Sequence, residues 1–491
     1  MIKNKIKNLR KKFEQYNIHG YIVPKNDEFF SEYTLNDRLN NISNFTGSAG
    51  MAVILKNKNY LFVDGRYTIQ AQNECSENFK IIETHKKLPG MIIKNLNLGF
   101  DPSLFTFKQL KYFFLNKNNL ISINKNLIDE IYKKKTEKIK PFFSLNNNIV
   151  GESHQSKISK IINFLKLNKA DYIFVSAPEN VAWILNIRGY DNPNSPIPNS
   201  QLIIGKNKEL FLFADIKKTQ KIIKEKKIKK NQIIDFINFQ KTINVLGGKN
   251  FIIDSLSCSI FYEKIIKSKF NILERNDPTY KLKSIKNSSE IKNMIKAHKK
   301  DGLALTKFIY WIKNLNKKNI TEVDAQNKLE KFRKLSKDYL FPSFNTIAGT
   351  GSNGAIVHYR ATKLATKKIR KEDLFLCDSG GQYKFGTTDV TRTICFSQQK
   401  KFIKDIYTKV LKGHISVAQS NLNKYNTGKK IDLRARKFLK KDGLDYAHGT
   451  GHGVGFFLNV HEGPQSITKY NSIKIEKGMI LSNEPGFYKK N

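Results

Sequence analysis

The 491-residue sequence predicts a mixed α/β and α+β protein, in which two similar α/β modules precede an α+β region. Two observations lead to this prediction. Matching segments recur about 150 residues apart in the first half of the chain, which is the signature of an internal repeat. Beyond residue 340, glycine-punctuated strands replace the alternation of strands and helices. We therefore expect one fold that occurs twice, followed by a different one.

The repeat is visible in the order of the matching segments. YIVPKNDEFF at 21–30 resembles YIFVSAPENV at 172–181, and AVILKNKNYLFVD at 52–64 resembles LIIGKNKELFLFAD at 202–215. Each copy alternates short apolar strands with Lys-rich amphipathic helices, as α/β modules do. The break between the copies is expected in the polar stretch FSLNNNIVGESHQS. The predicted domains are 1–148, 149–282 and 283–491.

Two helices can be located from their apolar periodicity. The expected N-terminal helix carries on one face Ile2, Ile6, Leu9 and Phe13. In the third region, Asn287 and Ser288 can begin a helix with Glu290 in its first turn. The buried side of that helix is expected to carry Ile291, Met294, Ile295, Leu303 and Leu305.

The composition narrows the possible partners and compartments. The formal net charge is +45, but only 11 of the 87 basic residues are Arg and the Lys are spread along the chain, so we expect no specific nucleic-acid partner. No apolar run approaches the roughly 18 residues of a membrane span. The four cysteines form no C-x-x-C pair, which favours a reducing, cytoplasmic location without disulfides or structural zinc.

The segment HGTGHGVGFFLNVHEGP, 448–464, holds three of the nine histidines of the chain. His448 and His452 have the spacing of the two histidines in a helical H-E-x-x-H zinc site. However, each of the interleaved glycines would cost about 1 kcal/mol inside a helix. The segment is therefore predicted to be strand or loop, and the residues that complete a site must come from elsewhere in the chain.

Residues that could complete a site with these histidines occur in two further segments. In LFLCDSGGQYKFGTTDVTRTICF, 374–396, Asp378 and Asp389 lie at equal distances from a glycine-rich turn, so we expect a hairpin that places them opposite one another. Taken alone, either aspartate would more often be a solvated turn residue. In MILSNEPGF, a short apolar strand is expected to end at Glu484. Two aspartates, a glutamate and a histidine at strand ends indicate a dinuclear metal site.

The sequence resembles the Xaa-Pro aminopeptidases (aminopeptidase P) of the three-domain cytosolic type. The matching segments, in order, are NFTGSAG, LFVDGRYTIQA, NVAWILNIRG, FNTIAGTGSNGAIVHY, LFLCDSGGQY, TTDVTRTICF, HGTGHGVGFFLNVHEGP and LSNEPGFY. The resemblance implies two creatinase-like N-terminal domains and a catalytic domain of the pita-bread α+β fold. It also implies hydrolysis of the N-terminal residue from peptides with proline second, by a hydroxide that bridges two divalent metal ions, expected to be Mn²⁺. A homodimer is implied as well.

The resemblance also assigns roles to single residues. Asp378, Asp389, His452 and Glu484 would be the metal ligands, with Asp389 as a bridge and Glu484 also as the proton acceptor. The catalytic residues that face the substrate would be His358, His448 and His461. Arg188, in NIRG, either reaches toward the substrate or forms a structural ion pair.

Two departures leave alternatives open. The family carries a fifth, bridging Glu on a further strand, and no Glu follows Glu484, so the expectation is a fragment or a truncated gene product whose metal binding is weakened. The chain could also be a prolidase of the same fold, which cleaves only Xaa-Pro dipeptides. A catalytically silent peptide-binding scaffold is the third possibility.

Overall fold

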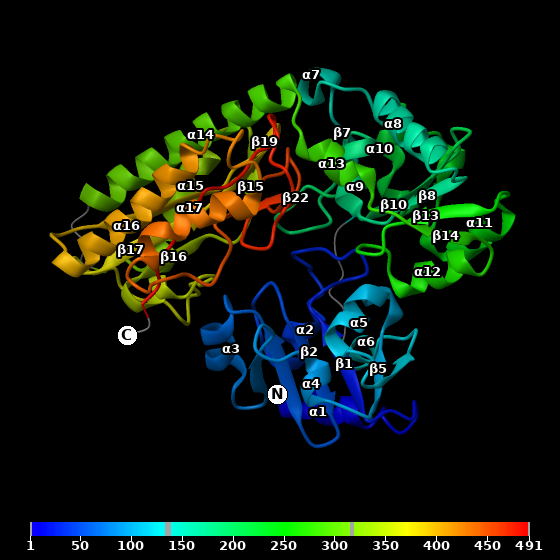
Figure 1. Ribbon diagram of the computed structural model, residues 1–491, viewed down its shortest axis with the longest axis horizontal. Helices are drawn as coiled ribbons and strands as arrows, with labels where there is room; N and C mark the ends of the chain where they lie inside the picture. Colours follow the sequence, from blue (N-terminus) through cyan, green and yellow to red (C-terminus); the bar gives the residue numbers. More distant parts are fainter. Residues whose placement is uncertain (1, 133–138, 315–318, 490–491) are drawn as a thin grey trace. The chain divides into compact units, whose positions relative to one another are not determined.

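The computed structural model describes residues 2–132, 139–314 and 319–489 (Figure 1). The chain divides into two compact units. The first comprises 1–145, 152–193 and 197–279, and the second comprises 146–151, 194–196 and 280–491. Among the helices of the described ranges, none combines the length and the apolar character needed to cross a membrane.

The first unit contains two sheets of six strands. The first sheet is built from β1 Gly20–Pro24, β2 Met51–Leu55, β3 Asn59–Val63, β4 Lys80–Glu83, β5 Asn97–Phe100 and β6 Asn119–Ser122. The second is built from β8 Tyr172–Val175, β10 Ser200–Gly205, β11 Leu210–Ala214, β12 Ile233–Ile234, β13 Asn250–Ile253 and β14 Asn271–Glu274. Their orders are β4-β3-β2-β1-β5-β6 and β12-β11-β10-β8-β13-β14. The central strands β1 and β8 each have one antiparallel and one parallel neighbour. The sequence repeat is therefore a repeat of topology.

Helices and one short ribbon complete the first unit. The helices are α1 Ile2–Arg10, α2 Arg38–Ser43, α3 Thr68–Cys75, α4 Pro89–Ile92, α5 Phe107–Phe114, α6 Leu127–Ile131, α8 His154–Leu167, α9 Pro178–Ile184, α10 Gln220–Lys224, α11 Phe239–Val245 and α12 Ile260–Lys267, with α13 Pro278–Ser284 at the boundary. The ribbon pairs β7 Phe143–Ser144 with β9 Ile187–Arg188. The predicted N-terminal helix is confirmed, because its apolar face is buried in the core of the first module.

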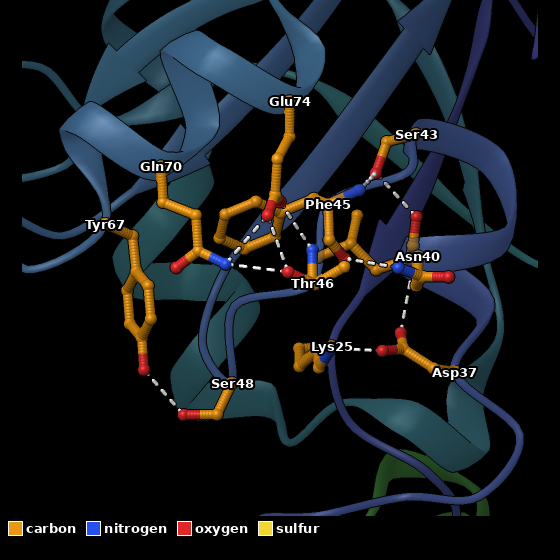
Figure 2. A network of polar contacts seen from close by, with 11 residues as sticks. Lys25, Asp37, Asn40, Ser43, Phe45, Thr46, Ser48, Tyr67, Gln70 and Glu74 are labelled. Atoms are coloured by element: carbon orange, nitrogen blue, oxygen red, sulfur yellow. Dashed lines mark hydrogen bonds and ion pairs between the residues drawn. The ribbon is translucent and has the colours of Figure 1, made fainter. Parts of the chain in front are cut away.

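A network of polar contacts connects the NFTGSAG segment to α3 (Figure 2). Glu74 accepts hydrogen bonds from Thr46, through the backbone N–H at 2.8 Å and through Oγ1 at 2.7 Å. Gln70 Nε2 donates to Thr46 Oγ1 over 2.7 Å, and the hydroxyls of Ser48 and Tyr67 lie 2.6 Å apart. Two motifs that are separate in the sequence are thus neighbours in the first module.

The second unit has three small sheets and several helices. Its strands are β15 Tyr339–Pro342, β16 Ile347–Thr350, β17 Leu374–Ser379, β18 Gly381–Tyr383, β19 Gly386–Thr387, β20 Val390–Cys395, β21 Gly451–Gly453 and β22 Glu462–Ile467. They form the sheets β15-β18-β19, β16-β17-β20 and β21-β22. Its helices are α7 Asn147–Val150, α14 Ser288–Asn314, α15 Glu322–Lys334, α16 Lys401–Ala418 and α17 Gly428–Lys440.

The long helix α14, green in Figure 1, begins where the sequence predicts. The backbone N–H groups and side chains of Asn287 and Glu290 exchange two hydrogen bonds of 3.0 Å, which closes the first turn. Met294 and Leu305 are buried as expected. The prediction is wrong for Ile295 and Leu303, which are 53% and 59% exposed, because the buried stripe runs one residue away from each of them.

The core of the second unit lies between α14, α15 and the sheet β16-β17-β20. Phe308 and Ile312 of α14 pack with Leu329 of α15 against Phe375 and Ile394 of the sheet. Cys377 is part of the same cluster and is buried. This packing holds β17, the strand that carries Asp378, against two helices.

Candidate metal centre

Strands β17 and β20 bring Asp378 and Asp389 to one end of a ladder. The expected pairing of the two aspartates is wrong by two residues, because Asp378 lies opposite Thr391. The chain leaves this sheet between the strands: β18 and β19 pair in another sheet, and a Cβ atom on Gly380 would collide with the carbonyl oxygen of Thr388. Since side chains alternate with a period of two, a shift of two residues keeps both carboxylates on the same face.

Asp378 is half-buried and lies among negative charges. Thr391 Oγ1 donates a hydrogen bond to Asp378 Oδ1 over 2.7 Å, which favours the ionised carboxylate. Burial and the charges of Asp389 and Glu484 oppose this effect and raise the pKa of Asp378 to about 8. A cluster of carboxylates that cannot all ionise at neutral pH is one that a cation would stabilise.

His452 supplies positive charge to this cluster. Its Nε2 lies 3.1 Å from Asp389 Oδ2 and 3.3 Å from Glu484 Oε1. Burial lowers the pKa of His452, but the hydrogen bond to Asp389 and the charges of both carboxylates outweigh burial and raise it to about 9. The other ring nitrogen, Nδ1, lies 2.9 Å from the carbonyl oxygen of Gly453, which fixes the ring orientation.

Glu484 is placed by a backbone ladder against β21. The N–H of Ser482 donates to the carbonyl of His452, and the N–H of Glu484 donates to that of Thr450, both over 2.8 Å. The sequence predicts a strand that ends at Glu484. The structure has isolated bridges at Met479 and Leu481 and single backbone hydrogen bonds in its place. Ser482 Oγ donates to Glu484 Oε1 over 2.8 Å and accepts from the N–H of His452 over 2.8 Å, so one hydroxyl orients both residues.

The segment 448–464 forms strand and loop, as its glycines predict. The glycines also make room for neighbouring backbone segments of the same chain. A Cβ atom on Gly451 would collide with the carbonyl oxygen of Ser482, and one on Gly453 would collide with that of Glu462. The close approach that these glycines permit is therefore between backbone segments.

The three histidines that were expected to face substrate come from three places. The rings of His461 and His452 lie 4.2 Å apart between centroids. His448 precedes β21, and its ring centroid lies 5.4 Å from that of Tyr488. His358 is half-buried on the loop between β16 and β17. The structure thus places the ring of His461 against that of His452, while His448 and His358 lie on separate segments.

Three carboxylates and one imidazole form a donor set that suits divalent ions such as Mn²⁺ or Zn²⁺. Within the described ranges, no group of three or more His, Cys, Asp and Glu side chains could hold a metal ion in its present arrangement. His452, whose pKa is raised by these carboxylates, is protonated at neutral pH. An imidazole must lose that proton before it can ligate a metal.

Sequence reasoning did not anticipate Thr391, Ser482 or Arg436. The first two lie two residues from the predicted ligands Asp389 and Glu484, and this spacing was the available signal. Arg436 of α17 donates to the carbonyl of His448 over 2.7 Å, and nothing in the local sequence indicates this. Arg188 is buried and donates to the carbonyls of Ala182 and Ile187 in the first unit.

Comparison with known proteins defines the class. Residues 292–491 match the model of the metallopeptidase family M24. Residues 5–131 and 133–290 each match a model of the creatinase/prolidase N-terminal domain. The chain is therefore an M24 metallopeptidase that carries two such N-terminal domains.

Individual relatives narrow the class further. The probable Xaa-Pro aminopeptidase P of Laccaria bicolor is 34% identical over 98% of this chain and 78% of its own. The X-prolyl aminopeptidase of Caenorhabditis elegans, described as a cytosolic enzyme with a di-nuclear active site, matches with a TM-score of 0.91 and 29% identity, over 100% of this chain and 85% of that one. The prolidase of Pyrococcus horikoshii matches with a TM-score of 0.55 and 27% identity, over 68% of this chain and 91% of that one.

The chain belongs to the Xaa-Pro aminopeptidase P family. The expected fold class, two creatinase-like α/β domains followed by a pita-bread α+β domain, is confirmed. So is the expectation that the protein is a peptidase.

Proposed function

We propose that the protein hydrolyses the N-terminal residue from peptides with proline in the second position, with the help of two divalent metal ions. The observation that carries this proposal is the contact of His452 with Asp389 and Glu484, beside Asp378. This cluster lies in a chain that resembles Xaa-Pro aminopeptidases over nearly its whole length.

In this proposal Asp378, Asp389, His452 and Glu484 hold the two ions, which we take to be Mn²⁺. When bound, such ions supply a bridging water activated to hydroxide and polarise the scissile carbonyl. Thr391 and Ser482 orient the carboxylates of Asp378 and Glu484 through their hydrogen bonds. Glu484 accepts the proton that the attacking water releases.

The three remaining histidines act on the substrate side. His461, whose ring lies against His452, and His358 donate hydrogen bonds to the oxygen that becomes negative in the tetrahedral intermediate. His448 lines the same pocket. The proline imide has no N–H group, so the site need not satisfy a backbone donor at that bond.

A peptidase assay on the full 491-residue chain tests the proposal. Chelated protein reloaded with Mn²⁺ should bind two ions per chain and cleave a tripeptide with proline second, but not one with alanine second. Asp389→Asn should remove both the cleavage and at least one ion. The exposed Asp405→Asn on α16 is the matched control and should change neither. A chain that binds no Mn²⁺ and cleaves nothing would instead be the silent peptide-binding scaffold.

Prolidase is the second candidate, because the P. horikoshii prolidase matches 68% of this chain. The C. elegans X-prolyl aminopeptidase matches the whole chain with a much higher TM-score, which favours the aminopeptidase. The two activities separate on substrate length: an aminopeptidase cleaves the Xaa-Pro tripeptide, and a prolidase cleaves only the Xaa-Pro dipeptide.

The remaining parts of the proposal concern organisation. We propose three domains, 1–148, 149–282 and 283–491, which the limits of the three family models support. The free thiols Cys75, Cys258, Cys377 and Cys395 and the cytosolic description of the C. elegans enzyme support a cytoplasmic location. A homodimer is proposed from the family resemblance, and sedimentation would test it.

A further inference from the structure

The first residue of α15, Glu322, is completely buried, and its carboxylate collects hydrogen bonds. Oε1 accepts from the backbone N–H of Thr350 over 2.8 Å. Oε2 accepts from the hydroxyl of Tyr359 and from the backbone N–H of Lys367, both over 2.8 Å. Asn353 Nδ2 lies 3.0 and 3.1 Å from the two oxygens. Four neutral donors therefore converge on one carboxylate.

All four donors lie on the segment 350–367, which starts at the last residue of β16, forms most of the connection to β17 and carries His358. Its only regular structure is the 3-10 helix Gly351–Ala355 and isolated bridges. Most of its side chains are half-buried or exposed, so apolar packing contributes little to its order. An irregular surface segment of this kind opens easily unless specific contacts hold it.

Glu322 itself is held rigidly. Its N–H donates to the carbonyl of Lys367 over 3.0 Å, and Thr321 and Asp324 form a capping box at the same helix end. Further along α15, Ala325 and Leu329 lie in the core of the second unit. A fixed helix end thus faces a segment that lacks order of its own.

We propose that Glu322 is a positioning residue for His358. Glu322 holds Tyr359, which follows His358 in the chain, and it also holds both ends of the segment 350–367. The imidazole of His358 therefore keeps one place relative to β17 and Asp378. The proposal rests on the proposed function, because it assumes that His358 acts on the substrate. A carboxyl group suits the task, because its two oxygens can accept hydrogen bonds from several donors at once.

Two substitutions and their matched controls test this role. Glu322→Gln keeps the side-chain shape but turns one acceptor into a donor that faces other donors. Tyr359→Phe removes the hydrogen bonds of the Tyr359 hydroxyl with Glu322, Asn353 and Ala365, all within the same segment and its anchor, and leaves the other three donors on Glu322. It therefore tests the idea even if the first variant folds poorly. The exposed Glu372→Gln and the 72%-exposed Tyr310→Phe are the controls.

The first readout does not depend on activity. In metal-free protein, both variants should exchange the backbone amide hydrogens of 350–367 about tenfold faster than the wild type, while those of α15 and β17 stay protected. The controls should exchange like the wild type. Unchanged exchange of this segment in both test variants would overturn the proposal.

The second readout is a double-mutant cycle on hydrolysis of a Xaa-Pro tripeptide. Glu322→Gln should lower kcat about ten- to a hundredfold with little change in KM. It should have almost no further effect when His358→Ala is already present, because Glu322 acts through that ring. If the effects of Glu322→Gln and His358→Ala on kcat multiplied in the double variant, Glu322 would have a general structural role, and the proposal would be overturned. If the wild-type chain cleaves no proline peptide, the proposed function fails, and the amide exchange of 357–359 decides whether Glu322 orders this segment.

Discussion

Thr391 Oγ1 donates a hydrogen bond to Asp378 Oδ1 from the position directly opposite on the neighbouring strand, over 2.7 Å. A group that orients a metal ligand in this way typically contributes about ten- to a hundredfold to metal affinity. We therefore expect Thr391→Val to weaken Mn²⁺ binding about tenfold, measured by titration calorimetry. Thr393→Val, two residues along β20 and opposite Leu376, is the matched control. Equal affinities for the two variants would refute a role for the Thr391 hydroxyl.

Arg436 holds the loop that carries His448. Its guanidinium donates to the carbonyls of Tyr446 and His448 over 2.8 and 2.7 Å, and it pairs with the fully buried Asp432. Arg436→Lys keeps the charge but loses the planar fork, so we expect kcat for a Xaa-Pro tripeptide to fall about tenfold or more. Arg434→Lys on the same helix should leave kcat unchanged. A loss of equal size in both variants would point to a general effect on α17.

Lys286 and Glu462 form a buried ion pair beside His461, with side chains 0% and 1% exposed. Lys283 Nζ lies 3.9 Å from the other carboxylate oxygen. Removing one partner leaves a buried charge poorly compensated, so we expect Lys286→Met to lower the free energy of unfolding of the second unit by about 3 kcal/mol. Urea unfolding in a Trp183→Phe background, where Trp311 of α14 reports this unit, would measure the change.

The double variant of Lys286→Met with Glu462→Gln is the test of coupling. Because the second change removes the charge that the first left uncompensated, the double variant should be more stable than the sum of the single effects by about 1–3 kcal/mol. Simple additivity would show that the two side chains do not stabilise one another.

Asp171 gives a pH-dependent prediction for the second module. Burial raises the pKa of its carboxyl, but hydrogen bonds from the N–H of Asn250, from Lys206 and from the N–H of Lys249 outweigh burial and lower the pKa from 3.8 to about 2. A pKa that is lower in the folded state stabilises the fold above pH 4, and this contribution is lost as the pH falls through 2.

We therefore expect Asp171→Asn to destabilise the module by about 1 kcal/mol at pH 7 and by almost nothing near pH 2. Urea unfolding followed through Trp183 at a series of pH values measures the difference. If Asp171→Asn destabilised the module equally at pH 7 and near pH 2, the ionised carboxylate of Asp171 could not be the source of the stabilisation.

Much of the fold follows from local patterns in the sequence. The repeat of YIVPKNDEFF and YIFVSAPENV corresponds to β1 and β8, each the central strand of a sheet with the same order. The apolar face of Ile2, Ile6 and Leu9 and the cap at Asn287 are equally local, because they depend on residues within a few turns of one another. These features were predictable since periodicity and capping need no distant partner.

The register of the site could not be predicted in the same way. The distance of Asp378 and Asp389 from the turn suggested a simple hairpin, but the chain changes sheets near Gly380. There the carbonyl of Thr388 and the hydroxyl of Ser343 leave no room for a side chain. Likewise, whether Ile295 lies in the core depends on which stripe of α14 meets the sheet. Both are decided by neighbours that are distant in the sequence.

The sequence by itself determined the chemical inventory of this protein: two copies of one α/β module, a glycine-rich segment that cannot be a helix, and the candidate ligands Asp378, Asp389, His452 and Glu484. Only the tertiary structure decided that His452 contacts two of these carboxylates, that Thr391 supports Asp378, and that Glu322 holds the segment of His358. The physical reason is that hydrogen bonds and charge interactions act over a few ångströms, so they depend on where the fold places residues that the sequence keeps far apart.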